Sequence, residues 1–329
     1  MAGRVGVLLV QLGGPEKREE LRPFLYELFA DPEIIGLPSP LRQIIAFLIA
    51  TFRAPKSAET YELIGWSPIR RWSRRQAELL ERELLAGGTP AFVRVGMTCS
   101  EPTVEEALRT LQEAEVTRLV VLPLYPQYSV TTTRSSFDRV TRALSRMAWR
   151  PERLDAPDSW YDEPRFVVAH ADRIRAAAAA LPDPDPSKTV LLYSAHSLPV
   201  ATVEKEKDPY PAHVEGTVKA IDAALGHRFR SRLGYQSKVG PVAWLGPSTP
   251  EVLAELAAAG ERQVIVVPVA FVSDHVETLF ECRLLFGGEA ARLGIPHYAV
   301  TDGLNDHPEF VRALAAIVAA TLGRARRAA

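Results

Sequence analysis

Four short runs of this chain are rich in Val, Leu and Ile and do not alternate between polar and apolar residues. The runs are Val5–Leu12, Arg118–Leu124, Thr189–Tyr193 and Gln263–Phe271. Apolar runs of this length without alternation are typical of parallel strands that are buried on both faces. We therefore predict four core strands.

The segments between these strands have apolar residues at helical spacing. They include Arg74–Leu85, Thr103–Ala114, Pro250–Ala259 and Phe310–Leu322. The second begins with Thr103 and has Glu106 three residues later, which is the pattern of a capping box. Alternating strands and helices predict an α/β fold with a doubly wound parallel sheet.

The chain also resembles itself. Residues 118–129 (RLVVLPLYPQYS) and 263–274 (QVIVVPVAFVSD) share an apolar strand, a proline at its end and a following loop, about 145 residues apart. We expect two related α/β halves, 1–150 and 151–329, with a boundary near Arg150–Asp158, where prolines interrupt the pattern. The last helix is a candidate for packing back on the first half.

Unusual polar loops follow the predicted strands. In open α/β sheets, ligands bind at the carboxyl ends of the strands. If the two halves face each other, these loops meet at one cleft. They are Gly13–Pro15, Tyr125–Thr133, Ser194–Pro199 and Ser273–Glu281.

Charge and cysteine content exclude several classes of protein. The 329 residues include 39 basic and 40 acidic side chains, for a net charge of −1. That balance gives no general attraction to nucleic acid. The two cysteines, Cys99 and Cys282, have no metal-type spacing, so we expect neither a disulfide framework nor a thiolate-bound cluster. A reducing cytoplasm fits best.

Two apolar segments bear on membrane contact. Val5–Leu12 is too short to span a bilayer and lacks a cleavage pattern, so we interpret it as the first strand and not as a signal. Leu41–Phe52 (LRQIIAFLIATF) is also too short to span. It is either a buried helix or an exposed apolar lip that touches a membrane or a hydrophobic ligand.

Titratable side chains gather after two of the predicted strands. His196 follows a strand and is either a hydrogen-bonded turn histidine or a general base or metal ligand, because imidazole titrates near neutral pH. Asp274, His275, Glu277 and Glu281 follow the last core strand. If a helix begins near His275, Glu277 and Glu281 share one face and repel each other, and a divalent metal would offset that repulsion. The alternative is a solvated acidic helix start.

A third group could hold a flat ligand that carries carboxylates. Tyr125 lies in an aromatic and hydroxyl-rich loop that could stack on such a ligand, or simply form a turn. Ser237 and Lys238, beside the indole of Trp244, could bind carboxylates together with Arg53, Tyr61 and Ser67, or each could be an ordinary surface group. Gly13–Pro15 is a poor dinucleotide fingerprint, since it lacks GxGxxG and Pro15 has no N–H.

As a set, these motifs resemble those of ferrochelatases, which insert ferrous iron into a porphyrin in haem synthesis. The matching pieces are QLGGPE, GWSPI at Gly65–Ile69, YPQYS, SAHSLP, DPYPAHVEGTV at Asp208–Val218, YQSKVGPVAWLGP and FVSDHVETLFE. They follow the family's order over about residues 5–312. The resemblance implies two flavodoxin-like or Rossmann-like halves, each with a parallel four-stranded sheet flanked by helices, as in chelatases, with the tetrapyrrole held between them.

The resemblance also implies roles for individual residues. His196 would be the proton acceptor and Glu277 its carboxylate partner, with Glu281 as a more distant relay; these three would also meet the metal. Asp274 and His275 would support them. The porphyrin-contacting positions would be Leu12, Arg53, Tyr61, Ser67, Tyr125, Ser237, Lys238 and Trp244. No permanent cofactor is required, and the partners would be the porphyrin and Fe²⁺.

Departures from the family pattern refine these expectations. Cys282 and Arg283 follow Glu281 where further acids are usual, which shortens the carboxylate path. Thr98-Cys99 replaces an Arg-Tyr pair found in many relatives. No cysteine-rich tail is present, so no iron–sulfur cluster is expected. Leu12 stands where relatives that prefer coproporphyrin tend to carry tyrosine, which favours protoporphyrin IX.

Several readings stay open at this point. The enzyme could make coprohaem instead of protohaem, or act as a cobalt chelatase on a corrinoid precursor, or be a two-lobed haem- or metal-binding protein without activity. We expect a monomer in the cytoplasm, in peripheral contact with the inner face of the cell membrane through Leu41–Phe52.

Overall fold

The computed structural model describes residues 3–238 and 240–324. The chain forms two compact units, Met1–Trp160 with Phe310–Ala329, and Tyr161–Glu309. The sequence places the division at residue 150, whereas the compact units divide after Trp160 and the chain returns to the first unit at Phe310.

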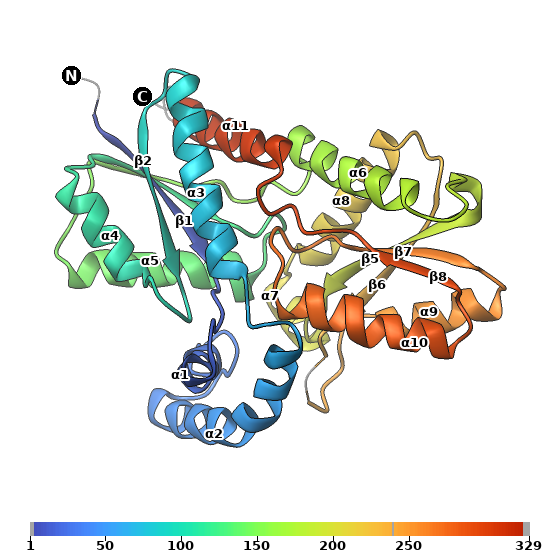
Figure 1. Cartoon of the computed structure of the whole chain (residues 1–329). Helices are drawn as coiled ribbons and strands as arrows, with labels where there is room; N and C mark the ends of the chain where they lie inside the picture. The colour runs from blue at the N-terminus through green and yellow to red at the C-terminus, as the bar shows by residue number, and fades with distance from the viewer. Residues whose placement is uncertain (1–2, 239, 325–329) are drawn as a thin grey trace. The chain divides into compact units, whose positions relative to one another are not determined.

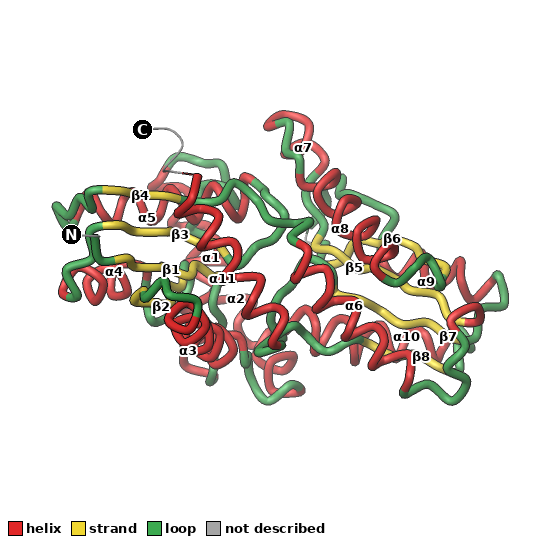
Figure 2. Tube along the Cα trace, turned by 90° about the horizontal axis from the view of Figure 1, so that it is seen from above, coloured by secondary structure: helices red, strands yellow, loops and turns green. Residues whose placement is uncertain are grey.

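Unit 1 is built on a parallel sheet with strand order β2-β1-β3-β4 (Figure 1; Figure 2). Val5 of β1 pairs with Ala91 of β2 and with Arg118 of β3. The strands are β1 Val5–Gln11, β2 Ala91–Met97, β3 Arg118–Pro123 and β4 Arg153–Asp155. The helices are α1 Arg18–Phe29, α2 Ser39–Leu63, α3 Ile69–Ala86, α4 Val104–Glu113, the π-helix η1 Val130–Arg134, α5 Ser135–Arg146 and α11 Pro308–Arg324.

Side chains of β1 and β3 and of helices α4 and α5 form one core cluster of unit 1. Leu8 and Val121 of the sheet pack there with Leu108 and Val140 of the helices, and all four are at most 1% exposed. The expected capping box starts α4, since Thr103 accepts from the Glu106 N–H and Glu106 accepts from the Thr103 N–H. This cap satisfies two helix-end donors.

Unit 2 repeats the arrangement with strand order β6-β5-β7-β8, all parallel. The strands are β5 Thr189–His196, β6 Arg230–Gln236, β7 Gln263–Pro268 and β8 His297–Val300. The helices are α6 Pro164–Ala179, the short 3₁₀ turn η2 Pro186–Lys188, α7 Val200–Glu206, α8 Tyr210–Ala224, α9 Thr249–Ala258, the π-helix η3 Glu277–Leu285 and α10 Phe286–Arg292.

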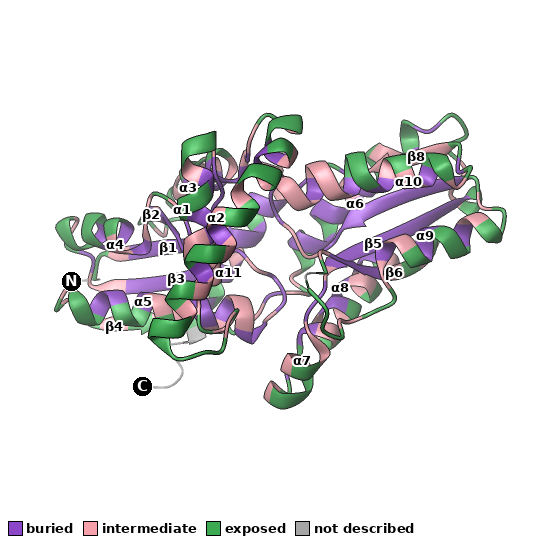
Figure 3. Cartoon of the chain, turned by 90° about the horizontal axis from the view of Figure 1, so that it is seen from below, coloured by how far each residue is buried: buried purple, intermediate pink, exposed green. Residues whose placement is uncertain are grey.

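The central strands β1 and β3 of unit 1, and β5 and β7 of unit 2, are almost completely buried (Figure 3). In unit 2, β5 and β7 pack on one face against α9, η3 and α10 through a cluster that includes Leu192, Leu253, Val264 and Cys282. Burial on both faces explains why β5 and β7 consist almost entirely of apolar residues.

The four strands predicted from apolar runs are confirmed as β1, β3, β5 and β7, and the fold class with them. These are the two central strands of each sheet. The pattern did not reveal β2, β4, β6 and β8. All four are edge strands, and the longer two, β2 and β6, carry the charged residues Arg94, Arg230 and Arg232, because one side of each is partly exposed.

The lip Leu41–Phe52 lies within α2, and most of its large apolar side chains are exposed, not buried. Phe52 is 78% exposed and Ile44 is 59% exposed, while only the small Ala46 and Ala50 are buried. The structure therefore favours the exposed lip over the buried helix. Within the described ranges, none of the helices combines the length and apolar character that crossing a bilayer requires.

Candidate active site at the carboxyl end of the second sheet

His196 is the last residue of β5, and its ring orientation is set by the backbone next to it. The Nδ1 atom lies 2.5 Å from the carbonyl oxygen of Ser197. A carbonyl only accepts, so Nδ1 carries the proton and the neutral ring has its lone pair on Nε2. The buried Tyr210 hydroxyl donates to the His196 carbonyl, which holds the end of the strand in place.

The carboxylate of Glu277 lies between two imidazoles. Its Oε1 is 3.6 Å from Nε2 of His196, and its Oε2 is 3.3 Å from Nε2 of His275. The Nδ1 of His275 lies 3.0 Å from the carbonyl oxygen of Ser273, so that ring is also oriented by the backbone. The basic nitrogen of His196 thus faces a carboxylate that can stabilise its protonated form.

Glu281 lies one turn further along the helix. Its Oε2 accepts from the hydroxyl of Ser237 and from Nε2 of Gln236, the latter at 2.9 Å. The segment from Glu277 is a π-helix instead of the α-helix that the spacing predicts. π-Helical segments are rare and are frequently found at functional sites. Sequence reasoning assigned Ser237 to carboxylates of a ligand, but here its partner is a carboxylate of the protein itself.

The two acids respond to their surroundings in opposite directions. Burial by itself raises the pKa of Glu277, but the charge of His196 and the hydrogen bond with His275 outweigh it, and the pKa lies below its ordinary value. Burial and the charge of Glu277 raise the pKa of Glu281, against the hydrogen bond from Ser237. Burial lowers the pKa of His275, but the hydrogen bond and charge of Glu277 reverse this and raise it. Pairs of acids with opposite shifts are typical of proton-transfer sites.

Asp274 holds the loop that precedes the helix. Its buried carboxylate accepts from the Thr278 hydroxyl at 2.9 Å, from the Asn305 amide at 2.7 Å and from the Gly303 N–H at 3.3 Å. Three donors on one buried carboxylate form a rigid anchor. Asp274 therefore connects the start of the helix to the loop after β8.

The remaining expected ligand contacts of unit 2 lie in the segment after β6. Lys238 is exposed. Trp244 is half-buried, and its indole N–H has no hydrogen-bond partner among the described residues. A buried donor without an acceptor is costly, which makes Trp244 a candidate for a ligand contact.

In unit 1, the structure places five expected ligand-contacting residues around the loop after β1, on α2 and after β3. Leu12 directly follows β1, and Tyr125 follows β3. The buried Ser67 packs against the loop, since its N–H donates to the carbonyl of Pro15 and a Cβ on Gly14 would approach its hydroxyl to 2.6 Å. Glycine is thus required there by close packing, not by a phosphate.

The other two of these residues belong to α2. The buried Tyr61 stacks on Trp66 with ring centroids 6.0 Å apart. Arg53 is exposed, and its guanidinium lies 5.5 Å from the ring centre of Phe29.

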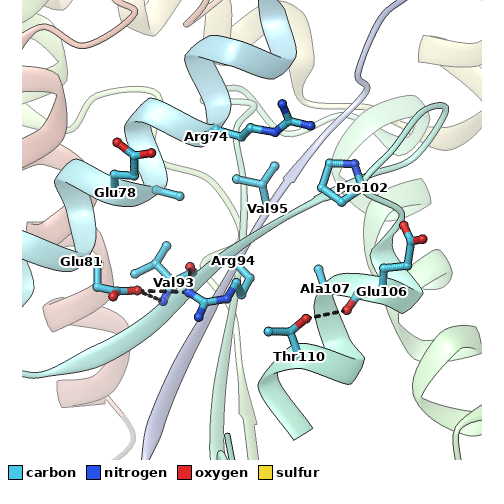
Figure 4. Close-up of a pocket in the computed structure, with 11 residues that line it drawn as sticks. Arg74, Glu78, Glu81, Val93, Arg94, Val95, Pro102, Glu106, Ala107 and Thr110 are labelled. Atoms are coloured by element: carbon cyan, nitrogen blue, oxygen red, sulfur yellow. Dashed lines mark hydrogen bonds and ion pairs between the residues drawn. The ribbon is translucent and has the colours of Figure 1, made fainter. Parts of the chain in front are cut away.

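A groove of about 360 Å³ lies elsewhere in unit 1, between α3, β2 and α4, and contains none of the expected site residues (Figure 4). Glu81 accepts there from the N–H of Val93 and pairs with Arg94, which covers part of the strand edge. Within the described part of the chain, no group of three or more His, Cys, Asp or Glu side chains is arranged to hold a metal ion.

Comparison with solved structures shows which known fold the chain adopts. The fold is similar to that of SirB from Bacillus subtilis with Fe³⁺, with a TM-score of 0.59, 13% identity, and coverage of 97% of this chain and 95% of that one. CbiX, described as the terminal enzyme for siroheme biosynthesis in denitrifying bacteria, matches with a TM-score of 0.51, 15% identity, and coverage of 96% and 98%. The architecture is that of chelatases.

Sequence comparison then identifies the family within this class. The ferrochelatase family model matches residues 4–322. Proteins named ferrochelatase from Cyanothece sp. and Gloeobacter violaceus are each 42% identical, over 96% and 97% of this chain and 82% and 98% of their own lengths. One from Synechococcus sp. is 44% identical over 95% of this chain and 92% of its own. This chain belongs to the ferrochelatase family, whose members insert metal into porphyrin in haem synthesis.

Proposed function

We propose that this protein inserts Fe²⁺ into protoporphyrin IX to form protohaem, with His196 as the first proton acceptor. The observation that carries the proposal is the Nε2 atom of His196, which has its lone pair free in the neutral ring and lies 3.6 Å from Glu277. Metal insertion releases two pyrrole N–H protons, so a base must stand near the centre of the macrocycle.

The neighbouring groups fit the steps that follow the first proton transfer. When His196 takes a proton it becomes an imidazolium, and the ionised Glu277 stabilises this charge. Glu281 has a raised pKa and can take up a proton nearer neutral pH than an ordinary glutamate. We assign it the role of a more distant relay. The incoming metal is a substrate that His196, Glu277 and Glu281 contact in passing.

We further propose a set of porphyrin-contacting residues. They are Leu12, Arg53, Tyr61, Ser67 and Tyr125 in unit 1, and Ser237, Lys238 and Trp244 in unit 2. The exposed Arg53 and Lys238 suit the carboxylates of the substrate. Leu12, which is apolar where coproporphyrin-preferring relatives tend to carry tyrosine, favours the porphyrin with fewer carboxylates.

The exposed lip of α2 supports peripheral contact with the inner face of the cell membrane. Leu41, Ile44, Phe47, Leu48 and Phe52 are each at least 46% exposed. Such a patch buries apolar area when it lies on a bilayer surface. The cytoplasmic location, the monomeric state, and the absence of a permanent cofactor and of an iron–sulfur cluster stay predictions.

Insertion of Zn²⁺ and Fe²⁺ into protoporphyrin IX and into coproporphyrin, followed by porphyrin fluorescence, tests the substrate. We expect a higher kcat/KM with protoporphyrin IX, and a clear preference for the four-carboxylate substrate would overturn this choice. The His196→Ala variant should lose insertion while it still binds porphyrin, and His227→Ala, at an exposed histidine, is the matched control. Near-normal turnover of His196→Ala would remove that residue from the proton step.

A further inference from the structure

Gln236 is a buried amide at the end of β6 that contacts the acidic helix of the candidate site. Only 2% of the residue is exposed. Its side chain bonds to the Glu277 carbonyl oxygen, the Glu281 carboxylate, the Ser194 hydroxyl and the Cys282 thiol. One side chain therefore joins β5 and β6 to the π-helix that carries both acids.

The contacts of Gln236 determine which way its amide points. The backbone carbonyl of Glu277 only accepts, so the atom 3.1 Å from it must be the donor Nε2. The second Nε2 hydrogen is then directed to Oε2 of Glu281, at 2.9 Å. The acceptor Oε1 receives the hydroxyl of Ser194 at 2.5 Å and the thiol of Cys282 at 3.1 Å.

The acceptor side of the amide is firmly supported by the sheet. The hydroxyl of Ser194 lies 2.7 Å from that of Thr249, the first residue of α9. The side chains of Ser194, Gln236 and Thr249 are all buried. Two residues before Gln236, a Cβ on Gly234 would come within 3.0 Å of the Thr249 Cα, so β6 and α9 pack with little room to shift. A buried network in which the amide uses both its donors and its acceptor holds one orientation.

We propose that Gln236 is a positioning residue for metal insertion, which fixes Glu281 and the first turn of the π-helix relative to His196. This inference rests on the proposed function. The Nε2 atom of the amide donates to the Glu281 carboxylate and to the Glu277 carbonyl oxygen. Its Oε1 atom accepts from Ser194 of β5, so the amide holds both groups in place relative to the sheet. Without the donor side, the Glu281 carboxylate would keep the hydroxyl of Ser237 as its hydrogen-bond donor among the described residues, and the first turn of the helix would lose its link to Gln236 of β6.

The test compares variants that remove the two sides of the amide separately. Gln236→Met keeps the length of the side chain but removes all four hydrogen bonds. Cys282→Ala, the matched control, removes one bond to Oε1 and leaves both Nε2 contacts in place. Gln236→Glu keeps an acceptor for Ser194 and Cys282 but loses the amide donors, and it carries the test if the Met variant does not fold.

The readout is Zn²⁺ insertion into protoporphyrin IX, with KM measured separately for metal and porphyrin at a temperature where circular dichroism shows each variant folded. We expect Gln236→Met to lower kcat about 10-fold to 100-fold and to raise KM for the metal, because small displacements of reacting groups have effects of this size. KM for the porphyrin should stay unchanged. Cys282→Ala should keep the wild-type kcat.

Two results would overturn the inference in different ways. Wild-type kcat and metal KM in a folded Gln236→Met or Gln236→Glu variant would show that the amide positions nothing that the reaction uses. An equal loss of kcat in Cys282→Ala and Gln236→Met would show a general loss of packing. Wild-type protein without any metal insertion would instead refute the proposed function itself.

Discussion

His170 on α6 offers a quantitative test of how unit 2 is stabilised. The imidazole is buried in the protein core, 3% exposed, with its ring perpendicular to that of Phe166 at a centroid distance of 4.8 Å. Its Nε2 atom has no hydrogen-bond partner among the described residues. We consider the substitution His170→Leu, which replaces the imidazole with an apolar side chain of similar size.

Burial, together with the positive charges of His307 and Arg173, lowers the pKa of His170 from 6.5 to about 3. In the unfolded chain the ring titrates at its ordinary value. Between these two pKa values the unfolded state binds more protons, so the free energy of unfolding falls as the pH falls below the unfolded pKa. From about pH 7 to about pH 5, the free energy of unfolding falls by about 2 kcal/mol, because each pH unit below the unfolded pKa contributes about 1.36 kcal/mol.

Urea denaturation at about pH 7, 6 and 5 measures this loss, with amide hydrogen exchange in β5 and β7 to report unfolding of unit 2. The wild type should lose about 2 kcal/mol more than His170→Leu between the two ends of this range. Near neutral pH the variant should be at least as stable, because it removes a buried polar atom without a partner.

If the free energy of unfolding of wild type and of His170→Leu changed equally over this pH range, the reasoning would be refuted. Such a result would mean that burial does not lower the proton affinity of His170.

Two further substitutions probe other parts of the fold. Asp274→Ala leaves the Thr278 hydroxyl, the Asn305 amide and the Gly303 N–H without their acceptor. The free energy of unfolding, measured by urea denaturation, should fall by about 3 kcal/mol. A fall of less than about 1 kcal/mol would mean that water replaces the carboxylate. Thr103→Ala removes the side-chain half of the capping box at α4 and should cost about 1 kcal/mol, whereas Thr110→Ala, inside the same helix, should have a smaller effect because it removes no cap; equal effects of the two would contradict the assigned cap.

The central strands were predictable because burial on both faces demands apolar residues at every position. Val7 to Val10 of β1 and Val264 to Val267 of β7 are all fully buried, so their sequence pattern follows directly from their place in the sheet. The edge strands are not buried on both faces, so their sequences are not uniformly apolar. Arg94 in β2 and Arg232 in β6 lie where one side of the strand is accessible, and their runs resemble those of helices or loops.

The candidate site was partly predictable for a different reason. His196 and Glu277 belong to polar stretches that directly follow core strands, and such positions converge at one edge of a parallel sheet. The partners of these residues could not be read from the sequence. Gln236 and Ser237 lie about 40 residues before the acids that they bind, and they come close only because β6 and β7 both pair with β5.

The amino-acid sequence by itself determined the α/β class, the central strands, the family and the identity of the chemical groups, because these depend on burial patterns and on the order of motifs along the chain. The tertiary structure alone decided that Glu277 lies between two imidazoles, that Glu281 is held by Ser237 and Gln236, and that the helix carrying both acids is a π-helix. Proton affinity and orientation depend on distances between groups that are remote in sequence, and folding sets those distances.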